Sequence, residues 1–321
     1  MRGSTLRPVI AAATLALFLG PIVLDQFWLR VFTSIFIFAA LAEAWNIIAG
    51  LTGYPAFGNV VFFGVGAYTT GILMIKAGAP HAAAALGGGV VAAAVAVVIG
   101  FPILRLKGHY FAIATLGVNE LIRAVVTNWT GFTGGGMGLT LPIMAAGVRG
   151  IYLYFYYAAL AVLMASVVAT LLIIRSRLGF GLRSLRDDED GAQVIGVPTT
   201  LLKTVAWATS AFFTALAGGV YAAWMTFIEP VNVFDMVLAV KFIVMALLGG
   251  LGTVFGPVVG AFVLELLSEL VWSQFLTIHL AALGLIIMVV VIFIPRGFAE
   301  FIAARRLSLG LFLENVRQNR V

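Results

Sequence analysis

Long apolar runs, separated by short polar stretches, recur along the whole chain. Each run holds roughly 17 to 25 residues, enough to cross about 30 Å of hydrocarbon as an α-helix. The runs are continuous, whereas strands of a membrane barrel alternate apolar and polar residues over about ten positions. The pattern therefore predicts an all-α polytopic membrane protein. We expect about ten transmembrane helices, near residues 8–24, 31–49, 59–77, 82–104, 109–127, 151–174, 204–224, 237–254, 257–275 and 278–294.

The composition agrees with this class. Of the 321 residues, 62% are hydrophobic and only 10% are charged, whereas about 25% of a soluble chain is charged. The chain has no cysteine, which excludes disulfides and thiolate chemistry. Arg2 and Arg7 precede the first apolar run, as in a signal peptide, but Pro21 and Asp25 follow it without a cleavage site. We therefore expect a retained first helix.

The distribution of basic residues predicts the orientation. Of the 19 Lys and Arg residues, 14 fall on the side of the N-terminus, 2 lie within spans, and 3 fall on the other side, namely Arg30, Lys76 and Arg149. Loops rich in Lys and Arg stay in the cytoplasm. Both termini are therefore predicted to be cytoplasmic. The net charge of +6 follows from this bias and from a basic tail, residues 296–321, and does not indicate nucleic acid.

One long connection, residues 175–203, differs from the others because it is highly charged. A single Asp, Lys or Arg at a helix centre costs about 2.5 to 3.5 kcal/mol in a membrane, so this stretch is predicted to be a cytoplasmic loop. The domain organisation is then a transmembrane domain, residues 1–295, with this loop and an external glycine-rich loop, residues 128–150, followed by the cytoplasmic tail.

Within the cytoplasmic loop, apolar residues fit one face of a short helix: Leu182, Leu185, Ala192 and Ile195. Gly196 and Pro198 give a stop signal. The apolar face needs a cover, either the membrane surface or a groove on a partner protein. A run of four acidic residues, 187–190, would be repelled by anionic lipid, which favours the partner over the membrane. A solvated loop without a partner is the third alternative.

The stretch "LRSLRDDEDGAQVIGV" resembles the cytoplasmic coupling loop of ABC importer permeases, in the LivM branch of the branched-chain amino-acid permeases. The family pattern has an Arg followed by acidic residues, then an Ala and, four residues later, a Gly. Gly191 departs from the usual Ala. By this resemblance, the residues that contact a separate ATPase are Leu182, Arg183, Leu185, Arg186, Asp187, Asp188, Glu189, Ala192, Ile195 and Gly196.

Four further blocks resemble the same family in the same order. They are "GLTGYPAFGNVVFFGVGAYTTGIL" (50–73), "LRLKGHYFAIATLGVNELIR" (104–123), "GFTGGGMGL" (131–139) and "LLGGLGTVFGPVVGA" (247–261). The first block departs from the family, which usually has Gln, Ser and His where this chain has Tyr54, Ala56 and Asn59. This departure puts a branched-chain amino-acid cargo in doubt.

The resemblance implies a transport subunit of the bacterial inner membrane rather than an enzyme. The chain has no G-x-x-x-x-G-K-[ST] motif, so it contains no P-loop. No cofactor is expected in this chain, and ATP and Mg are expected on partner subunits. The implied partners are a homologous permease subunit, two ATP-binding subunits and a periplasmic substrate-binding protein. The lipid bilayer surrounds the subunit, and no nucleic acid is expected.

Two glycine-rich stretches, "FGNVVFFG" (57–64) and "FGPVVGAF" (255–262), share a pattern. They are either broken or re-entrant helices that line the translocation pathway or sites of close helix packing. The pathway candidates are Gly53, Tyr54, Phe57, Gly58, Asn59, Gly249, Gly250, Gly252 and Gly256. In the external loop, the candidates are Thr133, Gly134, Gly135 and Gly136, in an ordered cap or docking face for the binding protein rather than a flexible linker.

Two alternatives stay open. The same class of ABC importer can carry another small organic cargo, such as urea, an amide or an organic acid. An ion-coupled secondary transporter would instead use buried acids, and the candidates are Glu43, Glu120, Glu265 and Glu269. Glu265 and Glu269 would then form a cation site, whereas Glu120 is expected to pair with Arg123 on one helix. No set of residues has the spacing of metal ligands.

Overall fold

The computed structural model describes residues 16–144, 146–274 and 284, and most of them are helical. Seven helical segments in this part are long and apolar enough to cross a membrane. They are α2 (Gln26–Thr52), η2 (Phe57–Asn59) with α3 (Val60–Lys76), α4 (His81–Ile103), α5 (His109–Asn128), α7 (Val148–Arg175), α10 (Thr199–Met225), and α11 (Pro230–Val233) with α12 (Met236–Gly249).

These segments match seven of the predicted spans, and α13 (Gly256–Gln274) matches an eighth, 257–275. Residues 8–15 of the predicted span 8–24 and almost all of 278–294 lie outside the described residues, as does the basic tail 296–321. The count of ten and the cytoplasmic placement of the termini therefore stay predictions. A short helix, η1 (Gly20–Ile22), precedes α2.

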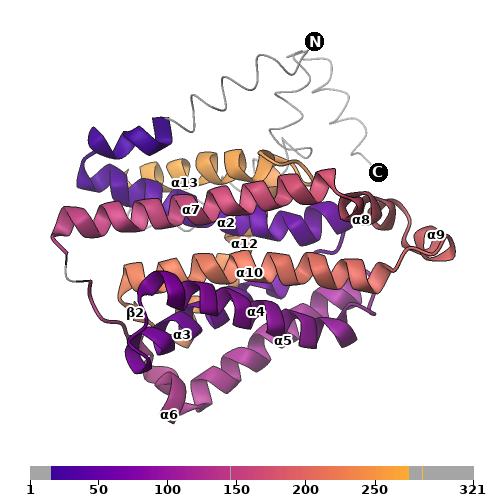
Figure 1. The fold of residues 1–321 in the computed structure, drawn as a ribbon, viewed down its shortest axis with the longest axis horizontal. Helices are drawn as coiled ribbons and strands as arrows, with labels where there is room; N and C mark the ends of the chain where they lie inside the picture. The colour runs from indigo at the N-terminus through magenta and orange to yellow at the C-terminus, as the bar shows by residue number, and fades with distance from the viewer. Residues whose placement is uncertain (1–15, 145, 275–283, 285–321) are drawn as a thin grey trace.

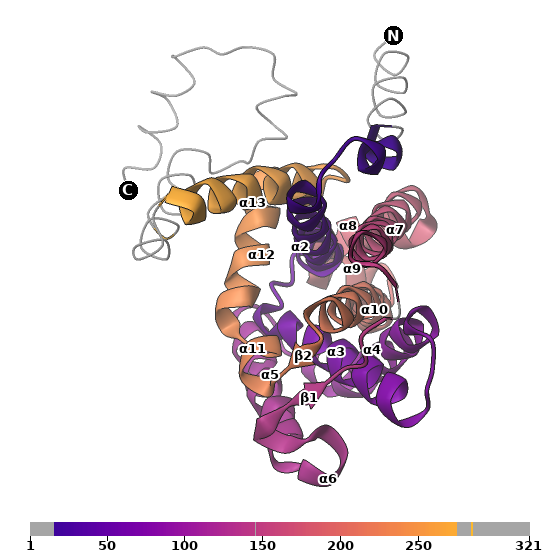
Figure 2. The same ribbon diagram turned by 90° about the vertical axis from the view of Figure 1, so that its left-hand side faces the viewer.

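Helix α2 is the central element of the bundle. It is apolar on all sides, and 20 of its 27 residues are buried, as expected for a helix surrounded by others. It contacts α7, α10, α12 and α13. Helix α10 packs against α2 on one side and against α3 and α4 on the other. The bundle therefore has two layers that share α10 (Figures 1 and 2).

Glycine allows α3 and α10 to pack with their backbones in contact. A Cβ placed on Gly66 would lie 2.2 Å from the carbonyl oxygen of Ala215, and one on Gly218 would lie 2.2 Å from that of Phe63. Small residues at helix interfaces permit this close approach in membrane proteins. The two helices are therefore in direct backbone contact at both positions.

The external loop forms short ordered elements: α6 (Thr130–Thr133), η3 (Gly135–Met137) and β1 (Leu139–Thr140). Strand β1 pairs antiparallel with β2 (Phe227–Ile228), which follows α10. The prediction of an all-α fold missed this pair, because two-residue strands give no alternating pattern. Gly138 has a φ of 77°, and a Cβ there would lie 2.2 Å from the carbonyl oxygen of Ile228, so the contact requires glycine.

We predict opposite effects on stability for two Gly→Ala substitutions in helices. Gly66→Ala is expected to lower the free energy of unfolding by about 1–3 kcal/mol, because the added methyl meets the α10 backbone. Gly117→Ala in α5 has no atom within 4 Å of the new Cβ and is expected to stabilise by about 0.5–1 kcal/mol. Thermal unfolding in detergent measures both. Equal shifts for the two variants would contradict the backbone contact.

Candidate functional site

The charged segment 176–203 folds into two short helices, α8 (Arg177–Asp187) and α9 (Glu189–Val194), at one end of the bundle (Figure 1). The expectation of a single helix over this segment is wrong. Asp188 has extended backbone angles, and its carboxylate accepts hydrogen bonds from the backbone N–H of Asp190 and Gly191, both at 3.1 Å. Asp188 therefore ends α8 and caps the start of α9.

The predicted apolar face is divided between the protein interior and the surface. Leu182, Leu185 and Ala192 are buried, whereas Ile195 is 76% exposed. Helix α8 packs against α2, α7 and α10 of the same chain. Leu182 and Leu185 therefore have their apolar neighbours within the subunit, and a contact of these two with a separate protein stays a prediction. The exposed apolar tip of α9 consists of Ile195 and Val194, which is 87% exposed.

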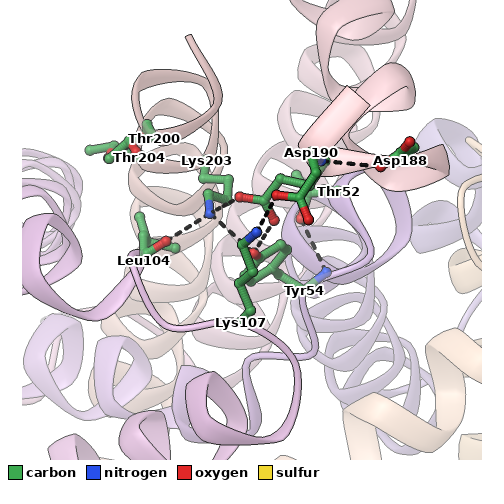
Figure 3. A network of polar contacts seen from close by, with 10 residues as sticks. Thr52, Tyr54, Leu104, Lys107, Asp188, Asp190, Thr200, Lys203 and Thr204 are labelled. Atoms are coloured by element: carbon green, nitrogen blue, oxygen red, sulfur yellow. Dashed lines mark hydrogen bonds and ion pairs between the residues drawn. The ribbon is translucent and has the colours of Figure 1, made fainter. Parts of the chain in front are cut away.

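A buried lysine holds α9 to the bundle. The side chain of Lys203 is only 2% exposed. Its ammonium donates to Glu189 Oε1 at 2.7 Å, to the carbonyl oxygen of Leu104 at 2.7 Å and to the Tyr54 hydroxyl at 3.1 Å. An ammonium has three protons to donate, and each has an acceptor here. Figure 3 shows Lys203 between Leu104 and Tyr54. We call Tyr54, Leu104, Glu189 and Lys203 the Lys203 network.

Tyr54 completes this network. Its hydroxyl donates to Glu189 Oε2, and the Lys203 ammonium lies 4.4 Å from the centre of its ring. Burial, and then the hydrogen bond and negative charge of Glu189, raise the pKa of Tyr54 above its ordinary value. The hydroxyl therefore stays protonated at neutral pH and remains a donor. Tyr54 was expected in the translocation pathway; the structure places its hydroxyl against α9, and a role in translocation stays a prediction.

A second ion pair joins α9 to the connection between α4 and α5. Lys107 donates to Asp190, and this hydrogen bond raises the pKa of Lys107 (Figure 3). Both side chains are more than half exposed. Water screens such surface pairs, so they contribute little to stability. Of the two contacts, the buried Lys203 network is the one that fixes the position of α9.

Arg186 connects α8 to the last turn of α2 and to the turn at residues 250–253. Its guanidinium donates to the carbonyl oxygen of Gly50 at 2.6 Å and lies beside Gly252, where a Cβ would be 2.5 Å from its Nη1 atom. Gly252 has a φ of 77°. The buried side chain of Asn46, in α2, binds the same turn: it accepts from the N–H of Gly252 at 2.7 Å and donates to the carbonyl oxygen of Thr253 at 2.9 Å.

Comparison with known families and proteins gives a consistent result. The family model of the branched-chain amino acid transport system permease component matches residues 27–295, most of the chain. The chain belongs to this permease family. No solved structure matches it.

Two relatives of the permease are high-affinity branched-chain amino acid transport system permease proteins, LivM. The one from Salmonella typhimurium is 30% identical over 83% of this chain and 68% of its own length. The one from Escherichia coli is 27% identical over 86% and 71%. The autoinducer 2 import system permease protein LsrC of Salmonella paratyphi B is 26% identical over 57% and 54%. The permease is thus a membrane component of an ABC-type transporter, and its relatives are transport subunits, not enzymes.

The glycine-rich pathway candidates of the permease lie mainly in tight contacts. A Cβ on Gly58 would lie 1.8 Å from the carbonyl oxygen of Thr115, and one on Gly249 would lie 1.7 Å from that of Gly256. The buried amide of Asn59 donates to Ser210 and Thr214 on α10. These contacts favour close packing at these positions. Gly53 and Gly250 end helices α2 and α12 with positive φ, and Phe57 is 38% exposed. Their role in translocation stays a prediction.

The remaining predicted residues lie on the surface or in the external loop. Arg183, Asp187 and Gly196 are exposed at the α8–α9 end. In the external loop, Thr133 and Gly135 are buried, Gly134 is half-buried and Gly136 is exposed. The Thr133 hydroxyl donates to the carbonyl oxygen of Val126 at 2.6 Å. The loop is therefore anchored on α5, and its role as a cap or docking face stays a prediction.

The acidic residues that a secondary transporter would need are mostly paired. Glu265 accepts from Ser34 at 2.6 Å and lies 2.7 Å from Lys241. Glu269 lies 3.7 Å from Arg30, and Glu120 pairs with Arg123 as expected. Glu43 is fully buried in α2. Because Glu265 and Glu269 each have a basic partner, the geometry disfavours a cation site between them. The described residues contain no metal-binding cluster.

Sequence reasoning missed Lys203 and Asn46 as functional candidates. Lys203 was counted only as one of the charges of the loop, and Asn46 lies within an apolar run. Both make their contacts with residues far away in the sequence, Asn46 with Thr253 and Lys203 with Tyr54. The one available signal is that a polar residue inside a transmembrane run needs a partner, which points to Asn46 but does not identify the partner.

We predict that Asn46→Ala loosens the turn at residues 250–253. The substitution leaves the N–H of Gly252 and the carbonyl of Thr253 without their partner, which costs about 1–3 kcal/mol. Amide hydrogen exchange of this turn should then be about tenfold faster or more. Asn128→Ala is the control, because its amide bonds only within an exposed helix end. Unchanged exchange in Asn46→Ala would contradict the bridging role.

Proposed function

We propose that the chain is the transmembrane permease subunit of a bacterial inner-membrane ABC importer for branched-chain or related small amino acids. The observation that carries the proposal is the α8–α9 element. It projects at one end of the bundle, presents the exposed apolar tip Val194 and Ile195, and is fixed to the bundle by a buried ion pair. Such an element suits mechanical contact with a separate protein better than a solvated loop does.

The orientation predicted from the basic residues puts this element in the cytoplasm, where ATP-binding subunits are available. Two such subunits hold ATP and Mg and close on each other when ATP binds. Their closure moves α8 and α9, and the bundle alternates between inward-open and outward-open states. A homologous permease subunit and a periplasmic substrate-binding protein complete the importer, the latter docking at the external loop that contains Thr133–Gly136.

The names of the LivM relatives support an amino-acid cargo. The departures from the family pattern at Tyr54 and Asn59 do not oppose it, because Tyr54 bonds to Glu189 and Asn59 bonds to Ser210 and Thr214 inside the bundle. Replacements at packed positions give no information on cargo. The ion pairs of Glu265 and Glu269 disfavour an ion-coupling site at these two residues.

Purification of the tagged chain from its native membrane in mild detergent tests the proposal. We expect an ATPase with a P-loop, a second permease and a binding protein to co-purify. Proteoliposomes that contain this complex and ATP should accumulate labelled leucine. Labelled urea, the alternative cargo, should not accumulate. A complex that contains no ATPase, or one that transports without ATP, would refute the importer.

We predict that Val194→Ser together with Ile195→Ser weakens association with the ATPase by about tenfold or more. Burying an apolar side chain at an interface contributes roughly 1.5–3 kcal/mol, and about 1.4 kcal/mol corresponds to a factor of ten. Ile143→Ser is the matched control, because Ile143 is 73% exposed but lies at the predicted external side. Titration of the ATPase onto immobilised permease gives the Kd. Equal affinity of the double variant and the control for the ATPase would contradict the proposed contact of α9 with the ATPase.

A further inference from the structure

We infer that Lys203 is a positioning residue for energy coupling: it holds α9 in a fixed place relative to the ends of α2 and α4. The inference rests on the proposed function and identifies how the docking element is connected to the transmembrane bundle. Lys203 itself lies in the first turns of α10 and is buried, so it acts through Glu189 rather than by touching an ATPase or the cargo.

The geometry of the ammonium supports this role. Its three acceptors come from three different segments: Glu189 from α9, Tyr54 from the turn after α2, and Leu104 from the end of α4. Three hydrogen bonds in different directions fix the position of the Nζ atom. Glu189 is the first residue of α9, so its carboxylate is attached directly to the helix that carries the exposed tip.

The second carboxylate oxygen of Glu189 makes the connection more rigid. It accepts the Tyr54 hydroxyl while the first oxygen accepts from Lys203. The carboxylate is therefore held on two sides by groups of the bundle. A displacement of α9 must then either move Tyr54 and Lys203 with it or separate a buried ion pair, which is unfavourable because both charges would lose their partners. Movement of α9 is consequently transmitted to α2 and α10.

The exposed pair Lys107–Asp190 provides the contrast. It joins the same helix to the α4–α5 connection, yet its side chains are 53% and 78% exposed. Water can replace either partner at little cost, so this pair holds α9 only loosely. The two lysines thus allow a comparison between a buried and an exposed connection to one short helix.

Stability alone does not explain why a charged pair occupies the buried position. An apolar pair of similar volume is often equally stable there. An apolar contact, however, permits sliding, whereas hydrogen bonds with fixed donors and acceptors do not. Hydrogen bonds therefore suit a connection that must transmit force between a docking helix and the bundle better than apolar contacts do.

The test uses the complete complex in proteoliposomes, with ATP hydrolysis and cargo uptake measured on the same sample. For Lys203→Met, we expect the ATPase to remain bound and to hydrolyse ATP, while cargo transported per ATP falls about fivefold or more. Lys203→Arg keeps the charge and the donors and should retain most of the coupling. Lys107→Met is the matched control and should change the ratio less than about twofold.

A further variant covers the case in which Lys203→Met does not fold because Glu189 is left unpaired. Lys203→Met combined with Glu189→Gln leaves no unpaired buried charge and should show the same uncoupling in a folded complex. The inference is overturned if either folded variant transports with the wild-type ratio, or if hydrolysis and transport fall in proportion. Absence of an ATPase from the wild-type complex would refute the proposed function instead.

Discussion

A charge in the interior of a protein must have partners of opposite charge or polarity, and in this permease that requirement determines where the α8–α9 element lies. Lys203 is among the largest fully buried side chains of the described region. Its ammonium is stable there only because Glu189, Tyr54 and Leu104 surround it. Since Glu189 begins α9, satisfying the lysine also places the helix. Removing the lysine would leave α9 attached by the Tyr54–Glu189 hydrogen bond, an exposed ion pair and the small buried side chain of Ala192.

The Arg186 contact applies the same principle to α8, with glycine as the second requirement. The arginine reaches the carbonyl of Gly50 at the end of α2 past Gly252, where a Cβ would lie 2.5 Å from Nη1, and a Cβ on Gly50 would lie 2.6 Å from the backbone nitrogen of Gly252. Asn46 then satisfies two backbone groups of the turn at residues 250–253. Close backbone approach and polar contacts therefore occur together: glycine brings the chains near each other, and hydrogen bonds between them need that proximity.

The sequence predicted the helices of the bundle well, because apolar runs of membrane length allow few other structures. Two predicted helix starts were too late, because charged or polar residues near them were assigned to loops. Helix α10 begins at Thr199 rather than near 204, since Lys203 was assigned to the loop although its ammonium is satisfied inside the bundle. In the same way, α2 begins at Gln26 rather than near 31, because Gln26 and Arg30 interrupt the apolar run.

The candidate site was predicted only in part. The family pattern located the charged segment, and Ile195 is exposed as a docking residue would be. The break at Asp188 was missed, because a helical face drawn through Leu185 and Ala192 does not account for a side chain that caps a new helix. The Lys203 network could not be predicted from the sequence, because Lys203 and Tyr54 are 149 positions apart and no local pattern indicates such a contact.

These long separations have a consequence for biogenesis. The hydrogen-bonded pairs are far apart in the sequence: Tyr54 and Glu189 by 135 positions, Gly50 and Arg186 by 136, and Leu104 and Lys203 by 99. Contacts between such distant positions form late in folding, because the intervening chain must first be ordered. Helix α9 therefore acquires its final position only after the transmembrane helices around it have assembled. Under the proposed function, an incompletely folded chain would present no ordered surface to the ATPase, and assembly of the transporter would itself select correctly folded subunits.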